Sequence, residues 1–356
     1  MRILLTGGAG FIGSHIAQAA LACGWDVTVL DSLEPAVHPR LSDIDPRLRF
    51  LKGDVGDRET VAVALDGADV VVHQSAKVGL GVDFSDAPDY VRNNDLATAV
   101  LLAGMAEAGI GALVLASSMV VYGEGAYTSV GGQLVRPGPR RASDLAAGIF
   151  DPRHPETGEL LTPALLDEDA RLDPRNVYAA SKLAQEHLAS AWARSTGGRA
   201  IALRYHNVYG PRMPKNTPYA GVASLFRSAL SRGEAPRVFE DGGQRRSFIH
   251  VADVAAANIS AVQALQAGNG RQFRAFNVGA NEVHTVGDVA RALSEAAGGP
   301  PPVVTGEFRL GDVRHITASS DRIKSELGWA PQRGFEDGMK EFALAPLRGE
   351  SQVSNS

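Results

Sequence analysis

The sequence of 356 residues lacks several features that mark whole classes of protein. It has one cysteine, Cys23, which excludes an internal disulfide and a cysteine-based metal cluster. Its apolar runs stay shorter than the stretch of about 18 residues that a membrane-spanning helix needs. The formal net charge of −5 gives no electrostatic reason to expect nucleic acid or an anionic membrane as a partner.

What is present is typical of an ordinary globular protein. Hydrophobic residues make up 44% of the chain and charged residues 21%, and a chain of this length can form a large core and a second, smaller lobe. The first residues, MRILLTGG, run into an apolar segment without a charged leader or a cleavage site. We therefore expect a cytoplasmic protein, in which Cys23 fills space in the core from an apolar helix.

Short apolar runs alternate with helical patterns through the first half of the chain. Near-continuous Val and Leu runs are typical of parallel strands buried on both faces, and the repeated alternation predicts right-handed crossovers. The sequence therefore predicts an α/β fold with a Rossmann-type doubly wound parallel sheet. The predicted strands are residues 3–6, 26–30, 48–52, 70–73, 113–117 and 200–205, and the predicted helices are residues 11–22, 58–65, 88–108 and 177–194.

The alternation loosens in the second half. We expect a Rossmann domain over residues 1–207 and a smaller mixed α/β lobe over residues 208–348, with some of its segments returning to the sheet. Residues 124–172 are rich in Pro and Gly, which predicts an inserted loop or lid. The polar residues 349–356 predict a disordered tail. Helices in the second lobe are predicted at residues 220–232, 254–266, 286–297 and 320–327.

A glycine-rich turn joins the first predicted strand to the first helix. Gly7 permits the tight turn, Gly10 lets the backbone approach a pyrophosphate, and Gly13 lets the helix pack closely. The helix N-terminus at Phe11 and Ile12 offers N–H groups and a partial positive charge to phosphates. This turn, in the context of a strand and a helix, predicts a dinucleotide site.

Residues at the ends of the next two predicted strands extend this site. Asp31 can accept hydrogen bonds from both adenosine ribose hydroxyls and would repel a 2′-phosphate, which favours NAD over NADP. Ser32 is placed beside it. We expect Asp54 and Val55 near the adenine edge, although a Gly-Asp pair at a strand end is also a common turn.

Tyr178 and Lys182 lie four residues apart, on one face of a predicted helix. A free tyrosine has a pKa of about 10, but a nearby lysine and a positive nicotinamide ring both favour the phenolate, so the pair can act as a general base. A surface helix pair is the alternative. Ser117 and Ser118 end a predicted strand at the carboxyl edge of the sheet, where Ser118 can hold a reacting hydroxyl together with Tyr178.

Taken together, these motifs resemble the extended short-chain dehydrogenase/reductase family, specifically its nucleotide-sugar epimerase/dehydratase branch. The similar stretches, in the order of that family, are TGGAGFIGSH, the pair Asn93 and Asn94, ASSMVVYG, NVYAASKLAQE, LRYHNVYGPR, RRSFIHVADVA and RLGDVRH. The resemblance implies NAD as the cofactor and Ser118, Tyr178 and Lys182 as the catalytic triad.

The resemblance also implies roles for residues elsewhere. Asn94 would anchor the hydrogen-bond network of the site, Asn207 would hold the diphosphate of a sugar nucleotide, and Asp312 would contact a ribose. Arg246 and Arg309 would face the phosphates and the ribose, and two guanidinium groups suit a pyrophosphate. The remaining cofactor residues are Gln74, Ser75, Ala76, Ser117, Tyr178, Lys182 and Tyr205, and the remaining substrate residues are Ser118, Met119, Tyr178 and Val238.

Three departures from the family pattern stand out. Val177 precedes the tyrosine where proline is usual, and Ser247 follows Arg246 where aspartate is usual, but neither change touches an atom that the chemistry needs. The insertion 124–172 is unusually long, and its residues 154–158 look like a Cys-Pro-x-Cys-Gly knuckle without the cysteines, so we expect no metal. Similar insertions occur in dTDP-L-rhamnose 4-epimerase-like enzymes, so a thymidine-linked deoxysugar is a candidate. We expect the insertion to form a lid or rim over the sugar.

The resemblance therefore implies an NAD-dependent 4-epimerase of a dTDP- or UDP-linked sugar, acting through a 4-keto intermediate. A 4,6-dehydratase or decarboxylase and an NAD-dependent sugar dehydrogenase are the enzymatic alternatives. Met119 and Val120 disfavour a dehydratase and a decarboxylase, because enzymes of the branch with those activities usually have acidic residues at these positions. A non-catalytic NAD-sensing regulator would not need the whole triad. The Ala- and Leu-rich helices 88–108 and 177–194 predict a homodimer.

Overall fold

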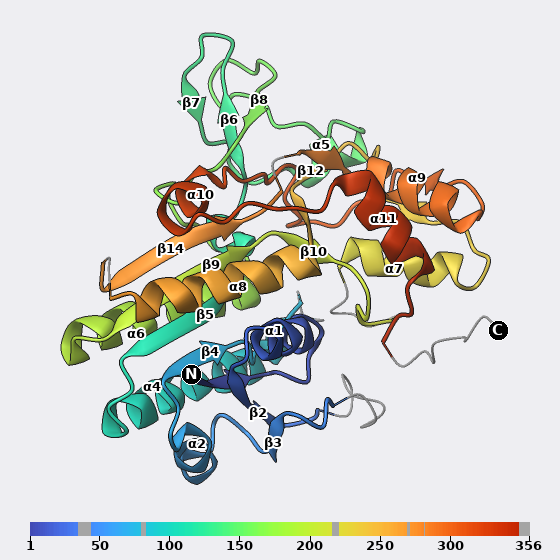
Figure 1. Cartoon of the computed structure of the whole chain (residues 1–356). Coiled ribbons are helices and arrows are strands. Elements are labelled where there is room, and N and C mark those ends of the chain that lie inside the picture. The colour runs from blue at the N-terminus through green and yellow to red at the C-terminus, as the bar shows by residue number, and fades with distance from the viewer. Residues whose placement is uncertain (35–43, 80–82, 216–220, 269–270, 281, 349–356) are drawn as a thin grey trace, which may run out of the picture.

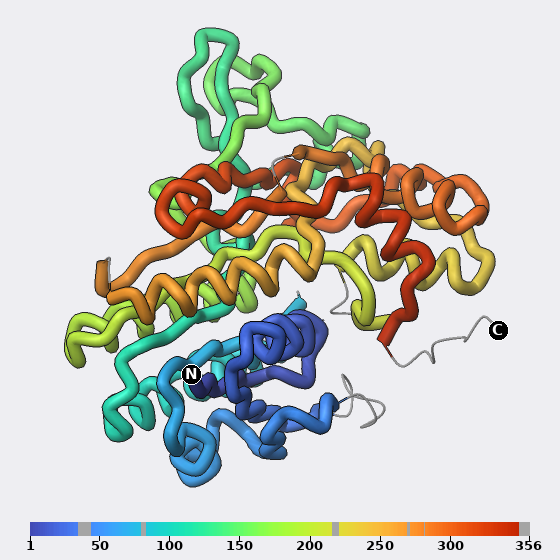
Figure 2. Tube along the Cα trace, viewed as in Figure 1, coloured from blue at the N-terminus to red at the C-terminus, as the bar shows by residue number. Residues whose placement is uncertain are grey.

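A seven-stranded parallel sheet forms the centre of the computed structural model, which describes residues 1–34, 44–79, 83–215, 221–268, 271–280 and 282–348 (Figures 1 and 2). The strand order is β14-β9-β5-β4-β1-β2-β3. The strands are β1 (Arg2–Thr6), β2 (Asp26–Asp31), β3 (Arg49–Lys52), β4 (Val70–His73), β5 (Ala112–Ser118), β9 (Arg199–Tyr205) and β14 (Phe273–Val278).

Helices cover both faces of this sheet. Helices α1 (Phe11–Ala22) and α8 (Val251–Gln266) pack on one face, and α2 (Arg58–Leu65), α4 (Ala97–Glu107) and α6 (Val177–Thr196) pack on the other. Alternate strand residues divide between the two cores, as Leu5 and Leu4 do in β1. Burial on both sides explains the near-continuous apolar runs, and the predicted doubly wound parallel sheet is confirmed.

The predicted helix 88–108 is wrong in detail. It is divided into α3 (Ala87–Tyr90), a π-helical stretch η2 (Val91–Leu96) and α4. A π turn holds an additional residue, which changes the direction of the side chains that follow, and such turns are frequent at functional sites. Apolar periodicity does not reveal it because both flanking segments are helical.

The expectation for Cys23 is also wrong. Helix α1 ends at Ala22, and Cys23 is the exposed residue that caps it. Gly24 follows with a φ of 72°, the left-handed conformation that commonly terminates a helix.

The second lobe packs its own helices around a separate core. This core holds residues from α7 (Val222–Leu230), α9 (Val286–Ala297) and α11 (Phe335–Leu344), and Phe11 of α1 packs against it. Strand β14 and helix α10 (Asp321–Leu327) lie at the edge of the Rossmann sheet. The short strand pairs are β10 (Asn207–Tyr209) with β13 (Phe248–His250), β11 (Arg237–Val238) with β16 (Val303–Val304), and β12 (Arg245–Arg246) with β15 (His284–Thr285).

The insertion, predicted as a loop or lid, contains short strands and a helix. Strands β6 (Ala126–Thr128), β7 (Leu134–Val135) and β8 (Thr162–Ala164) form an antiparallel sheet, and α5 (Ala142–Ala146) follows β7. Strands this short cannot show alternation in a sequence. Figure 1 places this sheet at the top of the view, on the opposite side of the molecule from α2 and β3.

Two short 3₁₀ segments, η1 (Phe84–Asp86) and η3 (Met119–Tyr122), complete the described elements. None of the described helices is both long and apolar enough to cross a membrane. The predicted tail, residues 349–356, lies outside the described residues.

Candidate active site

The glycine-rich loop between β1 and α1 is packed so closely that two of its positions exclude any side chain. A Cβ atom on Gly7, which has a φ of 68°, would lie 2.7 Å from the backbone nitrogen of Ser75. A Cβ atom on Gly13 would lie 2.2 Å from the carbonyl oxygen of Gly7. The loop is therefore held against the end of β4 and against the first turn of α1.

The same loop fits the pyrophosphate of a dinucleotide. Gly10 is the N-cap of α1, and no side chain caps this helix. A Cβ atom on Gly10 would meet one neighbour within 4 Å, the Gly7 carbonyl oxygen at 3.0 Å. The N–H groups at Phe11 and Ile12 thus begin a helix without a side-chain cap, as an anion site requires.

Asp31 is fixed at the end of β2 beside this loop. Its carboxylate accepts hydrogen bonds from the backbone N–H groups of Ala9 at 3.0 Å and Leu33 at 2.9 Å, and the residue is buried. In this position a carboxylate can accept hydrogen bonds from the hydroxyl groups of a ribose. Ser32, directly after it, is exposed.

Asp54 and Val55 have structural roles in the chain. The carboxylate of Asp54 accepts a hydrogen bond from the backbone of Gly56 at 2.8 Å, so it closes the turn that was the alternative interpretation. Val55 is buried in the core beneath α2 and α4. Both contacts are made within the chain. The placement of Asp54 and Val55 near the adenine edge stays a prediction.

Gln74 ties the end of β4 to the end of β9. Its amide oxygen accepts a hydrogen bond from the Tyr205 hydroxyl at 3.2 Å, and its amide nitrogen donates to Asn258 of α8 at 3.2 Å. Ser75 donates its backbone N–H to the Thr6 hydroxyl, and Ala76 follows. The sequence analysis missed Asn258, whose only signal is a polar side chain on the buried face of an apolar helix.

Asn94 joins three parts of the site. Its side-chain oxygen accepts a hydrogen bond from the backbone N–H of Lys77 at 2.7 Å, and its nitrogen donates to the Lys77 carbonyl at 3.0 Å and to the Ser181 hydroxyl at 2.8 Å. The residue is fully buried within the π-helical stretch. It therefore holds the loop after β4 against α6.

The predicted catalytic residues Ser118 and Tyr178 are brought together from β5 and α6. Ser118 is the last residue of β5, and Tyr178 lies in the first turn of α6, where Asn176 caps the helix. Burial raises the pKa of Tyr178 to about 12, while the neighbouring Ser118 hydroxyl lowers this pKa and the phenol of Tyr90 raises it further. In the chain alone Tyr178 is therefore a neutral phenol.

Lys182 lies one turn along α6 from Tyr178. Its ammonium group is buried and donates a hydrogen bond to the carbonyl of Ala116 at 3.0 Å. Burial lowers the pKa of Lys182 to about 7, although the carboxylates of Asp95 and Glu186 favour its charged form. Burial is the largest cause of the Tyr178 pKa shift, so a lowering of this pKa by Lys182 and by the nicotinamide ring stays a prediction for the enzyme with NAD bound.

A buried ion pair behind these residues was not expected. Ser117 donates its hydroxyl to Glu186, and the guanidinium group of Arg204 forms two hydrogen bonds with the same carboxylate, at 2.9 and 2.8 Å. Arg204 also donates to the Tyr122 hydroxyl at 2.9 Å. Ser117 therefore positions α6 through its side chain. Sequence reasoning had no signal for this pair, since its members lie in separate elements.

At the substrate end, the predicted residues differ in how they are placed. The side-chain oxygen of Asn207 is buried and has no hydrogen-bond partner within the described chain. Val238 is buried in the core of the second lobe, and Met119 is half-buried against the cluster around Tyr122. Val238 therefore contributes packing rather than an exposed contact.

Arg309 and Asp312 lie in the segment just before Val313. Arg246, in β12, contacts that segment. Arg246 donates to the carbonyls of Arg245, Arg314 and Val313, each at 2.8 Å, which uses three of its N–H groups. Arg309 is exposed, with its guanidinium carbon 5.2 Å from the centre of the Phe239 ring. Burial raises the pKa of Asp312.

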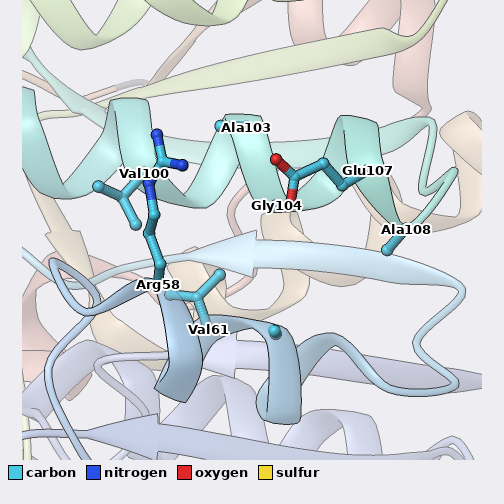
Figure 3. Close-up of a pocket in the computed structure, with 8 residues that line it drawn as sticks. Arg58, Val61, Val100, Ala103, Gly104, Glu107 and Ala108 are labelled. Carbon is cyan, nitrogen blue, oxygen red and sulfur yellow. The ribbon is translucent and has the colours of Figure 1, made fainter.

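A groove between α2 and α4 is shown in Figure 3, and it lies outside the predicted site. The residues that line it, none of them a predicted site residue, are Arg58, Val61, Ala62, Val100, Ala103, Gly104, Glu107 and Ala108. Within the described part of the chain, no group of three His, Cys, Asp or Glu residues is placed to hold a metal ion.

The chain is similar to named enzymes over nearly its whole length. The profile of the NAD dependent epimerase/dehydratase family matches residues 3–141 and 154–279. A dTDP-L-rhamnose 4-epimerase from Burkholderia thailandensis is 33% identical, with 96% of this chain and 93% of that protein covered. A UDP-glucose 4-epimerase from Azospirillum brasilense is 29% identical over 99% of this chain and 93% of its own length.

A solved structure agrees with these similarities. The UDP-glucose 4-epimerase of Thermus thermophilus, crystallised in complex with NAD, has a TM-score of 0.75 and 31% identity, and the match covers 96% of this chain and 98% of that one. The predicted family, the enzyme class and the NAD cofactor are thereby confirmed. The sheet, the glycine-rich loop and the neighbouring Ser118 and Tyr178 agree with these similarities. The chain belongs to the NAD-dependent epimerase/dehydratase family.

Proposed function

We propose that this chain is a 4-epimerase of a nucleoside-diphosphate sugar. The observation that carries the proposal is the placement of Ser118, at the end of β5, beside Tyr178 in the first turn of α6, with Lys182 one turn away at the carboxyl edge of the sheet. NAD, when bound, supplies a reversible hydride acceptor for C4 of the sugar. The glycine-rich loop and Asp31 would hold its pyrophosphate and its adenosine ribose.

The chain's own residues would move the proton. Tyr178 accepts the proton of the C4 hydroxyl, and Ser118 orients that hydroxyl. Because the pKa of Tyr178 is raised to about 12 in the chain alone, base catalysis requires positive charge nearby. Lys182 supplies part of this charge and would also hold the nicotinamide ribose, the role that its family resemblance implies.

The residues after Ser118 favour epimerisation over dehydration. Loss of water across C5 and C6 needs a general acid and a base close to the sugar. Met119 and Val120 follow Ser118 in η3, and neither side chain can carry a proton. Met119 packs instead against the apolar cluster that includes Val121. An epimerase needs only Tyr178, Ser118 and space for the keto sugar to turn.

Product analysis tests this choice directly. The purified enzyme would be incubated with UDP-, dTDP- and GDP-linked sugars, and the products identified by NMR and mass spectrometry. We expect a product isomeric with its substrate and no net consumption of NAD. A product lighter by one water or one carbon dioxide would identify a dehydratase or decarboxylase. Stoichiometric formation of NADH would identify a dehydrogenase.

We also propose which end of the site binds the nucleotide. The side-chain amide of Asn207 would hold the diphosphate by donating a hydrogen bond from its nitrogen, while its buried oxygen has no partner among the described residues. Arg246, Arg309 and Asp312 would contact the phosphates and the ribose. The dTDP- and UDP-linked sugars remain the two substrate classes of the proposal.

A homodimer completes the proposal. Val91 and Leu96 are large apolar side chains on the segment from α3 to α4, and they are 50% and 54% exposed. Packing of this segment and α6 against a second copy would cover them. Light scattering at micromolar concentration should give twice the chain mass of 37.4 kDa, and a monomer alone would contradict this part.

A further inference from the structure

The insertion lies along the C-terminal segment 312–319. Leu166, just after β8, donates its backbone N–H to Thr317 and accepts one from Ser319, both at 2.8 Å. At the other end of the insertion, the carboxylate of Glu124 accepts hydrogen bonds from the backbone N–H groups of Arg314 at 3.0 Å and His315 at 3.1 Å. Both ends of the insertion therefore form hydrogen bonds with segment 312–319.

Arg140 fixes the start of the same segment. Its guanidinium group donates two hydrogen bonds, from Nε and Nη2, to the backbone carbonyl of Asp312. The third nitrogen, Nη1, forms an ion pair with Glu240 at 2.8 Å, and the two side chains are 7% and 3% exposed. A guanidinium group can bind two acceptors in a defined geometry, so Arg140 sets the position of the Asp312 backbone.

Asp151 fixes the next residues. Its carboxylate accepts hydrogen bonds from Nε of Arg314 at 2.7 Å and from Nε2 of His315 at 3.2 Å. Nδ1 of His315 accepts the backbone N–H of Arg245 at 3.0 Å, so Nε2 carries the proton of a neutral ring. Burial lowers the pKa of His315 in agreement with this state.

The opposite side of the segment faces the substrate end. Arg246 binds the carbonyls of Val313 and Arg314, so the segment is held between Arg246 and the insertion. Arg140, Glu240 and Arg314 are under 10% exposed, whereas Asp151 is 50% exposed. Buried charges are costly to desolvate and stabilise weakly compared with apolar packing, so the three buried groups are better suited to defining a geometry. The geometry they define here is that of the Asp312 backbone.

We propose that Arg140 and Asp151 are positioning residues for the nucleotide end of the site. They hold segment 312–315 in place, and through it Asp312 and the Arg246 side chain, so that the insertion determines affinity for the nucleoside diphosphate of the substrate. This inference rests on the proposed function, which assigns Asp312 and Arg246 to the nucleotide. It gives the insertion a role away from the reacting C4 atom.

Arg140→Met and Asp151→Asn test the inference, and Arg136→Met is the matched control. Arg136 belongs to the same insertion, but its guanidinium group binds the carbonyl of Arg171 at 2.9 Å and is exposed. For each NAD-loaded variant, calorimetry would measure the Kd of UDP and dTDP, and steady-state assays would give KM and kcat. Hydrogen exchange would follow the amides of Arg314 and His315.

For Arg140→Met we expect the Kd of the bound nucleotide and the substrate KM to rise about 10- to 100-fold, with kcat changed far less. Asp151→Asn keeps an acceptor oxygen, so its effect should be smaller. Both variants should exchange the Arg314 and His315 amides faster while the Kd of NAD stays unchanged. Arg136→Met should match the wild type throughout.

The outcomes separate this inference from the proposed function. Unchanged amide exchange in both variants overturns the positioning role, whatever the substrate is. Faster exchange with an unchanged nucleotide Kd overturns the assignment to nucleotide affinity. A wild-type protein that binds neither UDP nor dTDP overturns the proposed function and the nucleotide assignment together, while faster exchange in Arg140→Met would still support the positioning of segment 312–315.

Discussion

The glycine-rich loop at one end of the site and the insertion at the other are held in shape by different parts of the chain. The loop is shaped by backbone packing, both within its own turn, where a Cβ atom added at Gly13 would lie 2.2 Å from the Gly7 carbonyl oxygen, and against Ser75 after β4. The insertion is held by side-chain contacts with residues far away in sequence, such as the buried ion pair of Arg140 with Glu240. Close backbone packing therefore defines the cofactor end, and long-range side-chain contacts define the other end.

The largest expected effect lies between these two regions, at the reacting atoms. Tyr178→Phe removes the phenol that accepts the proton but leaves both regions intact. We expect kcat to fall by about 10²- to 10⁴-fold, the usual contribution of acid–base catalysis, with an unchanged Kd for NAD. Single-turnover kinetics and NAD titration measure the two quantities. Turnover near the wild-type rate would show that Tyr178 is not the base.

The next effect breaks a long-range ion pair. Glu186→Ala leaves the guanidinium group of Arg204 buried without its carboxylate, and both side chains are under 5% exposed. We expect the free energy of unfolding to fall by about 3–5 kcal/mol. The control is Glu234→Ala, which breaks an exposed pair with Arg232 and should cost far less, because water screens exposed ion pairs. Equal losses in the two variants by chemical denaturation would contradict the comparison.

A third change breaks the backbone-built loop. Gly13→Ala places a methyl group against the Gly7 carbonyl, and overpacking of this kind costs about 1–3 kcal/mol. Because the loop must shift, we also expect weaker NAD binding. Gly111→Ala adds the same methyl group where the nearest neighbour, the Cα atom of Gly198, would lie 3.9 Å away, so it should have little effect on either quantity. Calorimetry with NAD would show a loss of affinity in Gly13→Ala only.

The smallest effect is a pH dependence at Lys182. Burial lowers the pKa of Lys182 from its ordinary value of 10.5 to about 7 in the folded chain. Between these two pH values the unfolded chain binds a proton that the folded chain does not, so this group makes stability rise with pH. The expected slope is roughly 1 kcal/mol per pH unit above pH 7.

Lys182→Met isolates this contribution, since methionine keeps the apolar stem and cannot titrate. The difference in unfolding free energy between wild type and variant, measured from pH 7 to 9, should change in favour of the wild type. A difference that does not vary with pH would mean that Lys182 keeps an ordinary pKa in the folded protein.

The sequence was sufficient wherever a function depends on residues close together in the chain. Helices 11–22, 58–65 and 286–297 and strand 70–73 have the predicted bounds. The pair Tyr178 and Lys182 is determined by helical spacing alone. The π-helical stretch around Asn94 was missed, because one additional residue in a turn leaves no trace in apolar periodicity.

By itself, the sequence determined the doubly wound sheet, the glycine-rich turn and the helical spacing of Tyr178 and Lys182, because β and α periodicity and turn geometry act over a few residues. Only the tertiary structure decided that Asn258 meets Gln74, that Glu186 meets Arg204, and that Arg140 binds the Asp312 backbone. These contacts join residues from separate elements, and their energy depends on burial and on distances of about 3 Å between charged or polar atoms. Apolar periodicity and short motifs do not specify the distances between atoms of separate elements.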